Sequence, residues 1–293
     1  MDIVTSYFRL FGAATLSGAL LFFPLAHAQP QGIQSARNEV QDAVHGIEQV
    51  GDADNAAVAA LKKDVLLKIV AFSKLEGEQM LTDIRELSLE NARPELGIIQ
   101  TALIEELEKA VAHFSAVLSA LTESQFPSTR ELETVAASFR EWRATTYDPL
   151  VKSALNLAIV MQTEGTLQTA ETRFAKISAA VKKISAFATN PSFETLLADA
   201  GLNLRNARLF LNRAKDTFIR AHLPFPNPRI SRVPASTLSA IPTVLSQEKT
   251  SVEYEMEARQ LIEQGLHAIK NAYGNFIDMN KLITELVRGR TKQ

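Results

Sequence analysis

Apolar side chains recur three and four residues apart along almost the whole chain, and alternation with a period of two is nearly absent. Side chains at this spacing lie on one stripe of an α-helix, whereas strands show the two-residue period. The most regular stripe alternates large side chains with alanine: Leu197, Ala200, Leu204, Ala207, Leu211, Ala214, Phe218 and Ala221. The pattern predicts an all-α protein whose helices approach closely at these alanines.

Proline and capping residues divide this pattern into separate helices. Pro94 suits the first turn of a helix, and Ser128 to Glu131 is typical of a capping box. Asp148 followed by Pro149 predicts a break or kink, and a domain boundary near 148 is one option. The expected helices cover about 33–50, 54–91, 94–122, 128 to the Asp148 break, 149–188, 192–222 and 246–289. Together they predict an elongated up-and-down bundle of about seven long helices within residues 29–293.

The segment before the last helix interrupts the helical pattern. Residues 223–245 contain five prolines, which exclude a continuous helix: Pro224, Pro226, Pro228, Pro234 and Pro242. One interpretation is an extended strap along the bundle, which would let the helices on either side of it lie parallel. The helix after the segment is expected to turn eight side chains inward: Val252, Ile262, Leu266, Ile269, Tyr273, Phe276, Ile283 and Val287.

Residues 1–28 have the features of a secretory signal peptide. Arg9 provides the positive charge, an uncharged apolar stretch follows, and Ala26-His27-Ala28 fits the rule of small residues before a cleavage site. The alternative is an uncleaved membrane anchor, for which the apolar stretch is short. No later stretch is long enough to cross a bilayer. We therefore expect a periplasmic or secreted, soluble protein after cleavage.

Composition narrows the possible source and chemistry. The chain has no cysteine, which excludes disulfides, thiolate metal ligands, cysteine nucleophiles and the lipidated cysteine of bacterial lipoproteins. An export signal without an acceptor site for N-glycosylation suggests a bacterial envelope or secreted protein. The formal net charge of −2 provides no electrostatic surface for a nucleic acid, so we expect no such partner.

Motifs for catalysis and metal binding are missing from the sequence. The glycines are scattered singly, so neither a P-loop nor a dinucleotide fingerprint is present, and no G-x-S-x-G elbow occurs. His45 has Asp42 three residues before it, but the pattern is not repeated as in ferritin-like metal sites. We therefore predict no metal site and no cofactor.

Two groups of residues are candidates for contacts with a partner. Trp142 and Tyr147 form an aromatic pair near a helix end, although Trp142 also falls on the apolar stripe and could pack in the core. The proline-rich segment carries no charge between Arg232 and Glu248 yet is rich in apolar residues. The candidate partner-binding residues are Trp142, Tyr147, Phe225, Val233, Leu238 and Ile241.

These observations predict a non-enzymatic interaction or assembly module that binds a protein partner or associates with itself. The long coiled-coil-like seams and the missing catalytic motifs favour it. One alternative is a bundle that binds an apolar ligand or lipid, with residues 223–245 as its lid. Others are a helical pore-forming protein, and an enzyme whose catalytic residues are distant in sequence.

Overall fold

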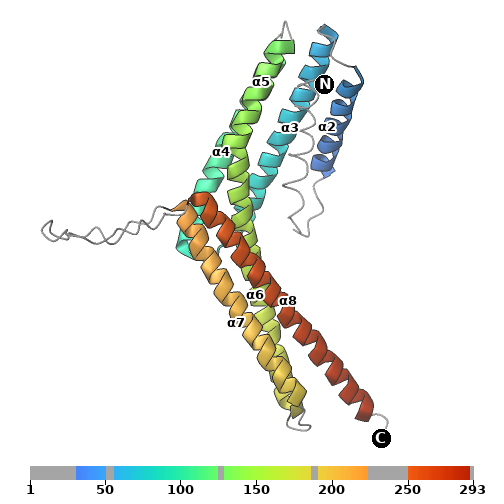
Figure 1. The fold of residues 1–293 in the computed structure, drawn as a ribbon, viewed down its shortest axis with the longest axis vertical. Coiled ribbons are helices and arrows are strands. Elements are labelled where there is room, and N and C mark those ends of the chain that lie inside the picture. The colour runs from blue at the N-terminus through green and yellow to red at the C-terminus, as the bar shows by residue number, and fades with distance from the viewer. Residues whose placement is uncertain are drawn as a thin grey trace, which may run out of the picture. The chain divides into compact units, whose positions relative to one another are not determined.

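The computed structural model describes residues 31–50, 56–90, 92–124, 129–185, 191–223 and 250–290, and within them the chain is helical and has no strand. The helices are α2 (Gln31–Val50), α3 (Ala56–Glu86), α4 (Pro94–Glu123), α5 (Thr129–Trp142), the π-helix η1 (Arg143–Tyr147), α6 (Asp148–Ser185), α7 (Pro191–His222) and α8 (Ser251–Arg290) (Figure 1). The prediction of an all-α helical bundle is confirmed, with helix boundaries close to those expected. The expected signal peptide and residues 224–245 of the proline-rich segment lie outside the described residues.

None of the helices in the described part of the chain combines the length and the hydropathy that a bilayer span requires. The chain divides into two compact units. Unit 1 comprises Met1–Glu86 and Thr101–Ala154, and unit 2 comprises Leu87–Gln100 and Leu155–Gln293. Helices α4 and α6 contribute residues to both.

In unit 1 the middle of α3 is buried against its neighbours. Val65 and Val70 have no exposed surface, and Ile84 near the end of the helix is equally buried. A Cβ atom added at Gly77 would lie 3.2 Å from Val111 Cγ2 of α4, so the missing side chain lets these helices approach closely. Helix α2 packs along α3 and buries Ile33.

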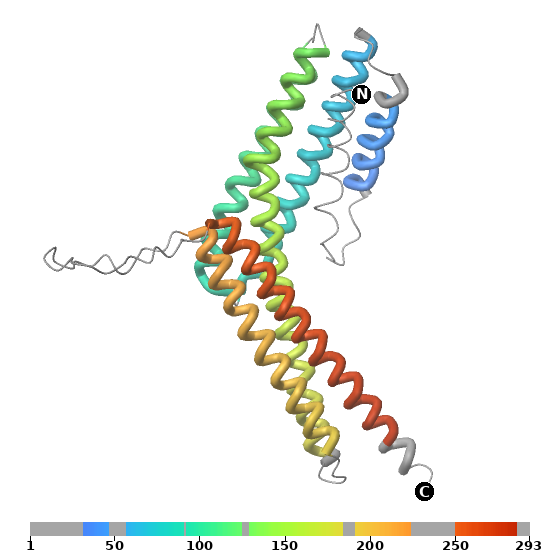
Figure 2. The backbone as a smooth tube through the Cα atoms, viewed as in Figure 1, coloured from blue at the N-terminus to red at the C-terminus, as the bar shows by residue number. Residues whose placement is uncertain are grey.

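In unit 2, α7 and α8 lie side by side (Figure 2). The predicted stripe of α7 is buried, and six of its residues expose 4% or less: Ala200, Leu204, Ala207, Leu211, Ala214 and Phe218. Opposite it, a Cβ atom added at Gly265 of α8 would lie 3.6 Å from the Ala207 carbonyl oxygen. Small residues therefore set the close spacing of α7 and α8, as predicted.

The helices of unit 2 alternate in direction. Ser251 Oγ donates a hydrogen bond to the Ala221 carbonyl oxygen at 3.0 Å, so the start of α8 lies beside the end of α7. The expectation that these two helices lie parallel is wrong: the prolines between them exclude a helix but do not force the chain to travel the length of the bundle. Helix α6 is antiparallel to α7, because Glu164 pairs with Lys215 while Glu171, further along α6, pairs with Arg208, which comes earlier in α7.

Candidate functional site

A π-helical segment, Arg143–Tyr147, joins α5 to α6 without a gap, so of the two expectations at Asp148-Pro149, a break or a kink, the break is excluded. The Asp148 amide donates to the Arg143 carbonyl oxygen, five residues earlier, instead of four. Pro149 explains this wider turn, because it has no amide hydrogen for the carbonyl it would meet in an α-helix and its ring crowds that turn. π-Helical turns often occur at functional sites, where the extra residue re-aims side chains.

The widened turn directs Arg143 and Tyr147 into the core of unit 1, where they expose 6% and 2% of their surface. Arg143 Nη1 donates to Ser73 Oγ at 2.6 Å, and Nη2 donates to Asp148 Oδ1 at 3.3 Å. Arg143 Nη2 also lies 3.8 Å from Glu76 Oε2. We call Ser73, Glu76, Arg143, Tyr147 and Asp148 the Arg143 cluster.

Burial dominates the electrostatics of this cluster. It raises the pKa of Glu76 from 4.5 to about 7, against the lowering effects of Arg143 and Arg37, while Asp148 raises it further. Burial also raises the pKa of Tyr147, so its phenol stays protonated at neutral pH. The buried Nε of Arg143 has no hydrogen-bond partner among the described residues. The net charge of the cluster therefore depends on the protonation of Glu76.

Aromatic rings surround Tyr147 on the α4 and α5 side. The Phe114 ring lies 4.9 Å from the Tyr147 ring and 5.2 Å from the Trp142 ring, measured between centroids. Trp142 is half-buried, and its ring lies 3.9 Å from that of the exposed His113. The structure thus places Tyr147 inside the core and Trp142 at its edge.

The other candidate partner-binding residues of the sequence, Phe225, Val233, Leu238 and Ile241, lie outside the described residues. The sequence interpretation also missed Glu76 and Arg143. A signal for both was present: Glu76 stands four residues from Phe72 and Met80 on an inward stripe, and Arg143 stands four residues from both Phe139 and Tyr147. A charged residue at an inward position predicts a buried ion pair.

Unit 2 has a different feature, a row of exposed apolar side chains on α8. Val252, Met256, Leu266 and Ile277 expose 57%, 55%, 40% and 58% of their surface. At about 100° per residue, the four fall within roughly 80° on one side of the helix, over a length of about 37 Å. We call these four residues the α8 stripe. Leu202 and Leu209 are likewise exposed, at 50% each, and stand seven residues apart on one side of α7.

The expected inward orientation of Val252 and Leu266 is therefore wrong. Small residues occupy the side of α8 that packs in the core of unit 2, together with Ile262, Ile269 and Phe276. Ala268 and Ala272 are buried there, and so is Gly265 against the α7 backbone. The close helix spacing selects small residues for the interior, and two larger side chains are left on the surface.

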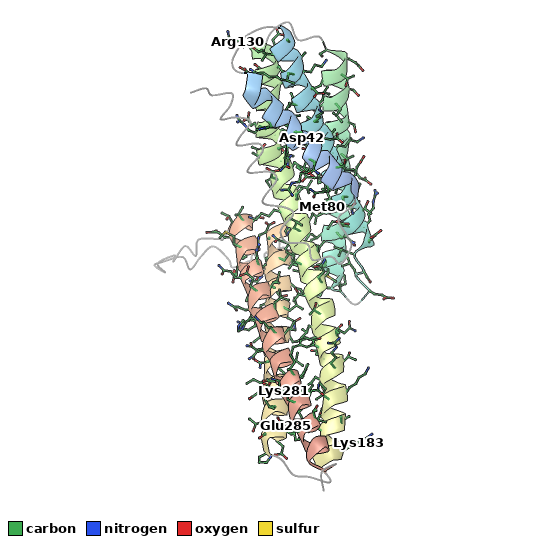
Figure 3. The ribbon with its side chains drawn as sticks, turned by 90° about the vertical axis from the view of Figure 1, so that its right-hand side faces the viewer. Asp42, Met80, Arg130, Lys183, Lys281 and Glu285 are labelled. Atoms are coloured by element: carbon green, nitrogen blue, oxygen red, sulfur yellow. The ribbon has the colours of Figure 1, made fainter. Side chains whose placement is uncertain are left out.

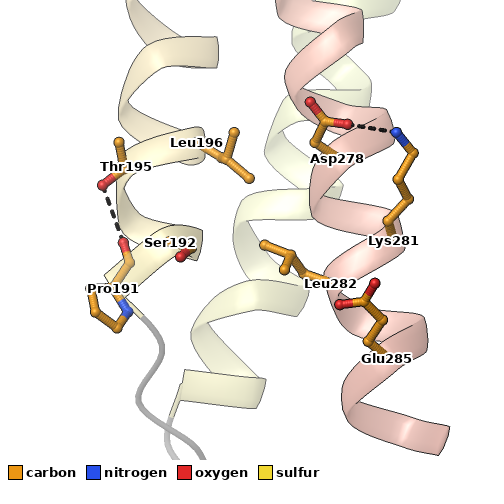
Figure 4. A pocket seen from close by; sticks show the side chains of 8 residues that line it. All are labelled: Pro191, Ser192, Thr195, Leu196, Asp278, Lys281, Leu282 and Glu285. Atoms are coloured by element: carbon orange, nitrogen blue, oxygen red, sulfur yellow. Dashed lines mark hydrogen bonds and ion pairs between the residues drawn. The ribbon is translucent and has the colours of Figure 1, made fainter.

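An open groove of about 580 Å³ lies between the first turns of α7 and the last part of α8 (Figure 4). It is lined by Pro191, Ser192, Thr195, Leu196, Asp278, Lys281, Leu282 and Glu285. Leu196 and Leu282 extend into the space between the helices (Figure 4), while Lys281 and Glu285 stand on successive turns of α8 (Figure 3). Lys281 Nζ is paired with Asp278 Oδ1 at 2.8 Å, so the groove has apolar walls and a charged, internally paired rim.

The described residues contain no group of three or more side chains that could hold a metal ion. No protein-family model, no curated protein and no solved structure matches the chain. The candidate functional sites are therefore the Arg143 cluster in unit 1, and the α8 stripe and the groove in unit 2.

Proposed function

We propose that the chain is an exported, non-enzymatic interaction or assembly module that binds through the α8 stripe. The observation that carries this proposal is the alignment of Val252, Met256, Leu266 and Ile277 on one side of α8, each at least 40% exposed. Single exposed apolar residues are common, but a row of them along one helix face is typical of surfaces that contact another molecule. The signal-like residues 1–28 support export.

The arrangement of the Arg143 cluster supports a non-catalytic role. Arg143 is occupied by Ser73, Asp148 and Glu76 within the core, and Tyr147 is enclosed by aromatic rings. General acid–base chemistry needs a group within reach of a substrate, whereas these groups contact one another. We assign the cluster to the stability of unit 1.

Site-specific photo-cross-linking in intact cells tests the proposed function. A benzophenone side chain placed at Met256 or at Ile277 should each give a discrete cross-linked product of higher mass. The matched control is Gln264, which is exposed on the same helix but turned well away from the α8 stripe. The proposal fails if neither stripe position gives a product, or if the Gln264 position gives the same products at the same yield.

The groove between α7 and α8 favours a second candidate, an apolar-ligand or lipid site. The side chains of Leu196 and Leu282 provide apolar contact, and the Lys281 ammonium can meet a polar head group. Native mass spectrometry of the protein from its own source should then show a bound small molecule, which replacement of Leu282 by Asp releases. An unliganded mass in mild conditions would exclude this candidate.

A further inference from the structure

We propose that the partner of the α8 stripe is a second copy of this chain, bound antiparallel about a two-fold axis between Leu266 and His267. This inference rests on the proposed function and names its partner. Four charged residues with described side chains share the face of the stripe, Arg259, Glu263, Lys270 and Lys281, and the pairing of Glu263 with Lys270 determines the choice of partner. At about 100° per residue, all four lie within the angular range of the four apolar residues.

The stripe is complementary to itself when two copies run in opposite directions. About the proposed axis, residues equally far from the point between Leu266 and His267 face each other across the interface. Met256 then faces Ile277 of the second copy, and both are more than half exposed in the single chain. Leu266 faces His267 of the second copy and lies one residue from its own counterpart at the axis. Apolar residues thus meet at the centre and at the Met256–Ile277 pairs, whereas the outermost stripe residue, Val252, faces Lys281 of the second copy, whose methylene groups can cover it.

The charges fit this antiparallel arrangement and oppose a parallel one. Glu263 faces Lys270 of the second copy, and by symmetry this pair occurs twice. In a parallel in-register pair, Glu263 would face Glu263 and Lys270 would face Lys270. Like charges at facing positions disfavour a pairing, and opposite charges at flanking positions determine orientation in paired helices.

The pairing of Arg259 with Gly274 leaves room for close contact. Arg259 faces Gly274 of the second copy, and an added Cβ at Gly274 would meet no described atom within 4 Å. The long Arg259 side chain, which pairs with Glu263 of its own helix at 3.7 Å, can therefore lie over a flat part of the facing helix. A bulky residue at position 274 would prevent this.

The absence of native cysteine makes the geometry directly testable by disulfide formation in the full chain. Leu266→Cys alone should give a disulfide-linked dimer under mild oxidation, because the residue lies next to the axis, one residue from its own counterpart. Met256→Cys and Ile277→Cys should form few dimers separately but cross-link when the two variants are mixed. Gln264→Cys is the matched control for random collision. Equal cross-linking of Leu266→Cys and Gln264→Cys overturns the proposed axis.

Charge exchange separates self-association from binding to another protein. Glu263→Lys and Lys270→Glu should each weaken the dimer by roughly tenfold, because each places two like-charged pairs in the contact. The double variant Glu263→Lys/Lys270→Glu should recover most of the wild-type affinity, whereas Gln264→Lys should behave as wild type. Sedimentation equilibrium measures the dissociation constants.

The outcomes distinguish this inference from the function on which it rests. A dimer that both single variants weaken and the double variant restores supports the antiparallel copy. A dimer that the double variant does not restore overturns the register. If the chain is a monomer at all concentrations but still gives photo-cross-links at Met256, the second copy is wrong and the interaction function stands. If the photo-cross-links are also missing, both fail.

Discussion

Arg143 Nη1 donates a hydrogen bond to Ser73 Oγ across 2.6 Å, which ties the π-helical segment to the middle of α3. Ser73 Oγ in turn donates to the Ile69 carbonyl oxygen at 2.9 Å, so its orientation is fixed by its own helix. The widened turn before Pro149 therefore replaces a helix break with a contact between residues 70 positions apart.

Replacement of Arg143 by Met should destabilise unit 1, because Glu76 then stays buried without its cation. We expect a loss of about 3 kcal/mol in the free energy of unfolding at pH 8. The loss should be smaller at pH 5.5, where Glu76 is protonated. Trp142 is the only tryptophan of the chain and lies in unit 1, so its fluorescence during urea unfolding reports on this unit. Arg130→Met, at an exposed position, is the control and should change stability by at most about 0.5 kcal/mol.

The raised pKa of Glu76 predicts a specific dependence of stability on pH. Folding holds the proton more tightly than the unfolded chain does, so this contribution is fully present below pH 4.5 and is lost as the pH rises through about 7. The total change is about 3 kcal/mol. Glu76→Gln should remove it, so the variant should match the wild type near pH 4 and be more stable at pH 8. A constant stability difference between the two proteins from pH 4 to 8 would contradict the assignment.

Two glycine replacements should have opposite effects because their surroundings differ. An added Cβ at Gly77 meets Val111 Cγ2 at 3.2 Å and the Tyr147 hydroxyl at 3.4 Å. We expect Gly77→Ala to lower stability by about 1 kcal/mol, because crowding outweighs the gain in helix propensity. Gly165, within α6, has no described atom within 4 Å of the added Cβ, so Gly165→Ala should stabilise by about 0.5–1 kcal/mol. Thermal unfolding followed by circular dichroism measures both.

Neighbouring positions on α8 should separate stability from association. Ile269 exposes 3% of its surface, and Ile269→Ala should lower the free energy of unfolding by about 3 kcal/mol. Leu266 exposes 40%, and Leu266→Ala should change monomer stability by less than about 0.5 kcal/mol while weakening association. Chemical unfolding at low concentration, followed by circular dichroism, measures stability without the contribution of association. A large loss from Leu266→Ala under these conditions would place that residue in the core.

Much of the fold could be predicted from the sequence because the helical signals are local. Three such signals can be recognised from residues close together in the sequence. They are the apolar stripe of α7, Pro94 at a helix start, and the near absence of two-residue alternation. The inward side of α8 could not be predicted by size, because close packing against α7 places Gly265 and Ala272 inside and leaves Leu266 outside. The distance between α7 and α8 therefore decides whether the large or the small side chains of α8 face the core.

The π-helical segment was beyond local inference for a different reason. Asp148-Pro149 is compatible with a helix break or with a widened turn, and the local residues do not choose between them. The choice depends on a buried partner for Arg143, which α3 supplies through Ser73 and Glu76. A charged residue at an inward position, such as Arg143, shows in the sequence that a buried partner is needed. Which residue is the partner becomes known only from the packing of the helices.

Sedimentation velocity over a series of concentrations, for the wild type beside Met256→Ser/Ile277→Ser, addresses the role of the α8 stripe most directly. Both residues are more than half exposed, so the double variant should keep the helical content of the wild type. The sedimentation coefficient of the wild type should rise with concentration, whereas that of the variant should remain at the monomer value. Identical concentration dependence for the two proteins would contradict the assignment of α8 as the surface through which two copies associate.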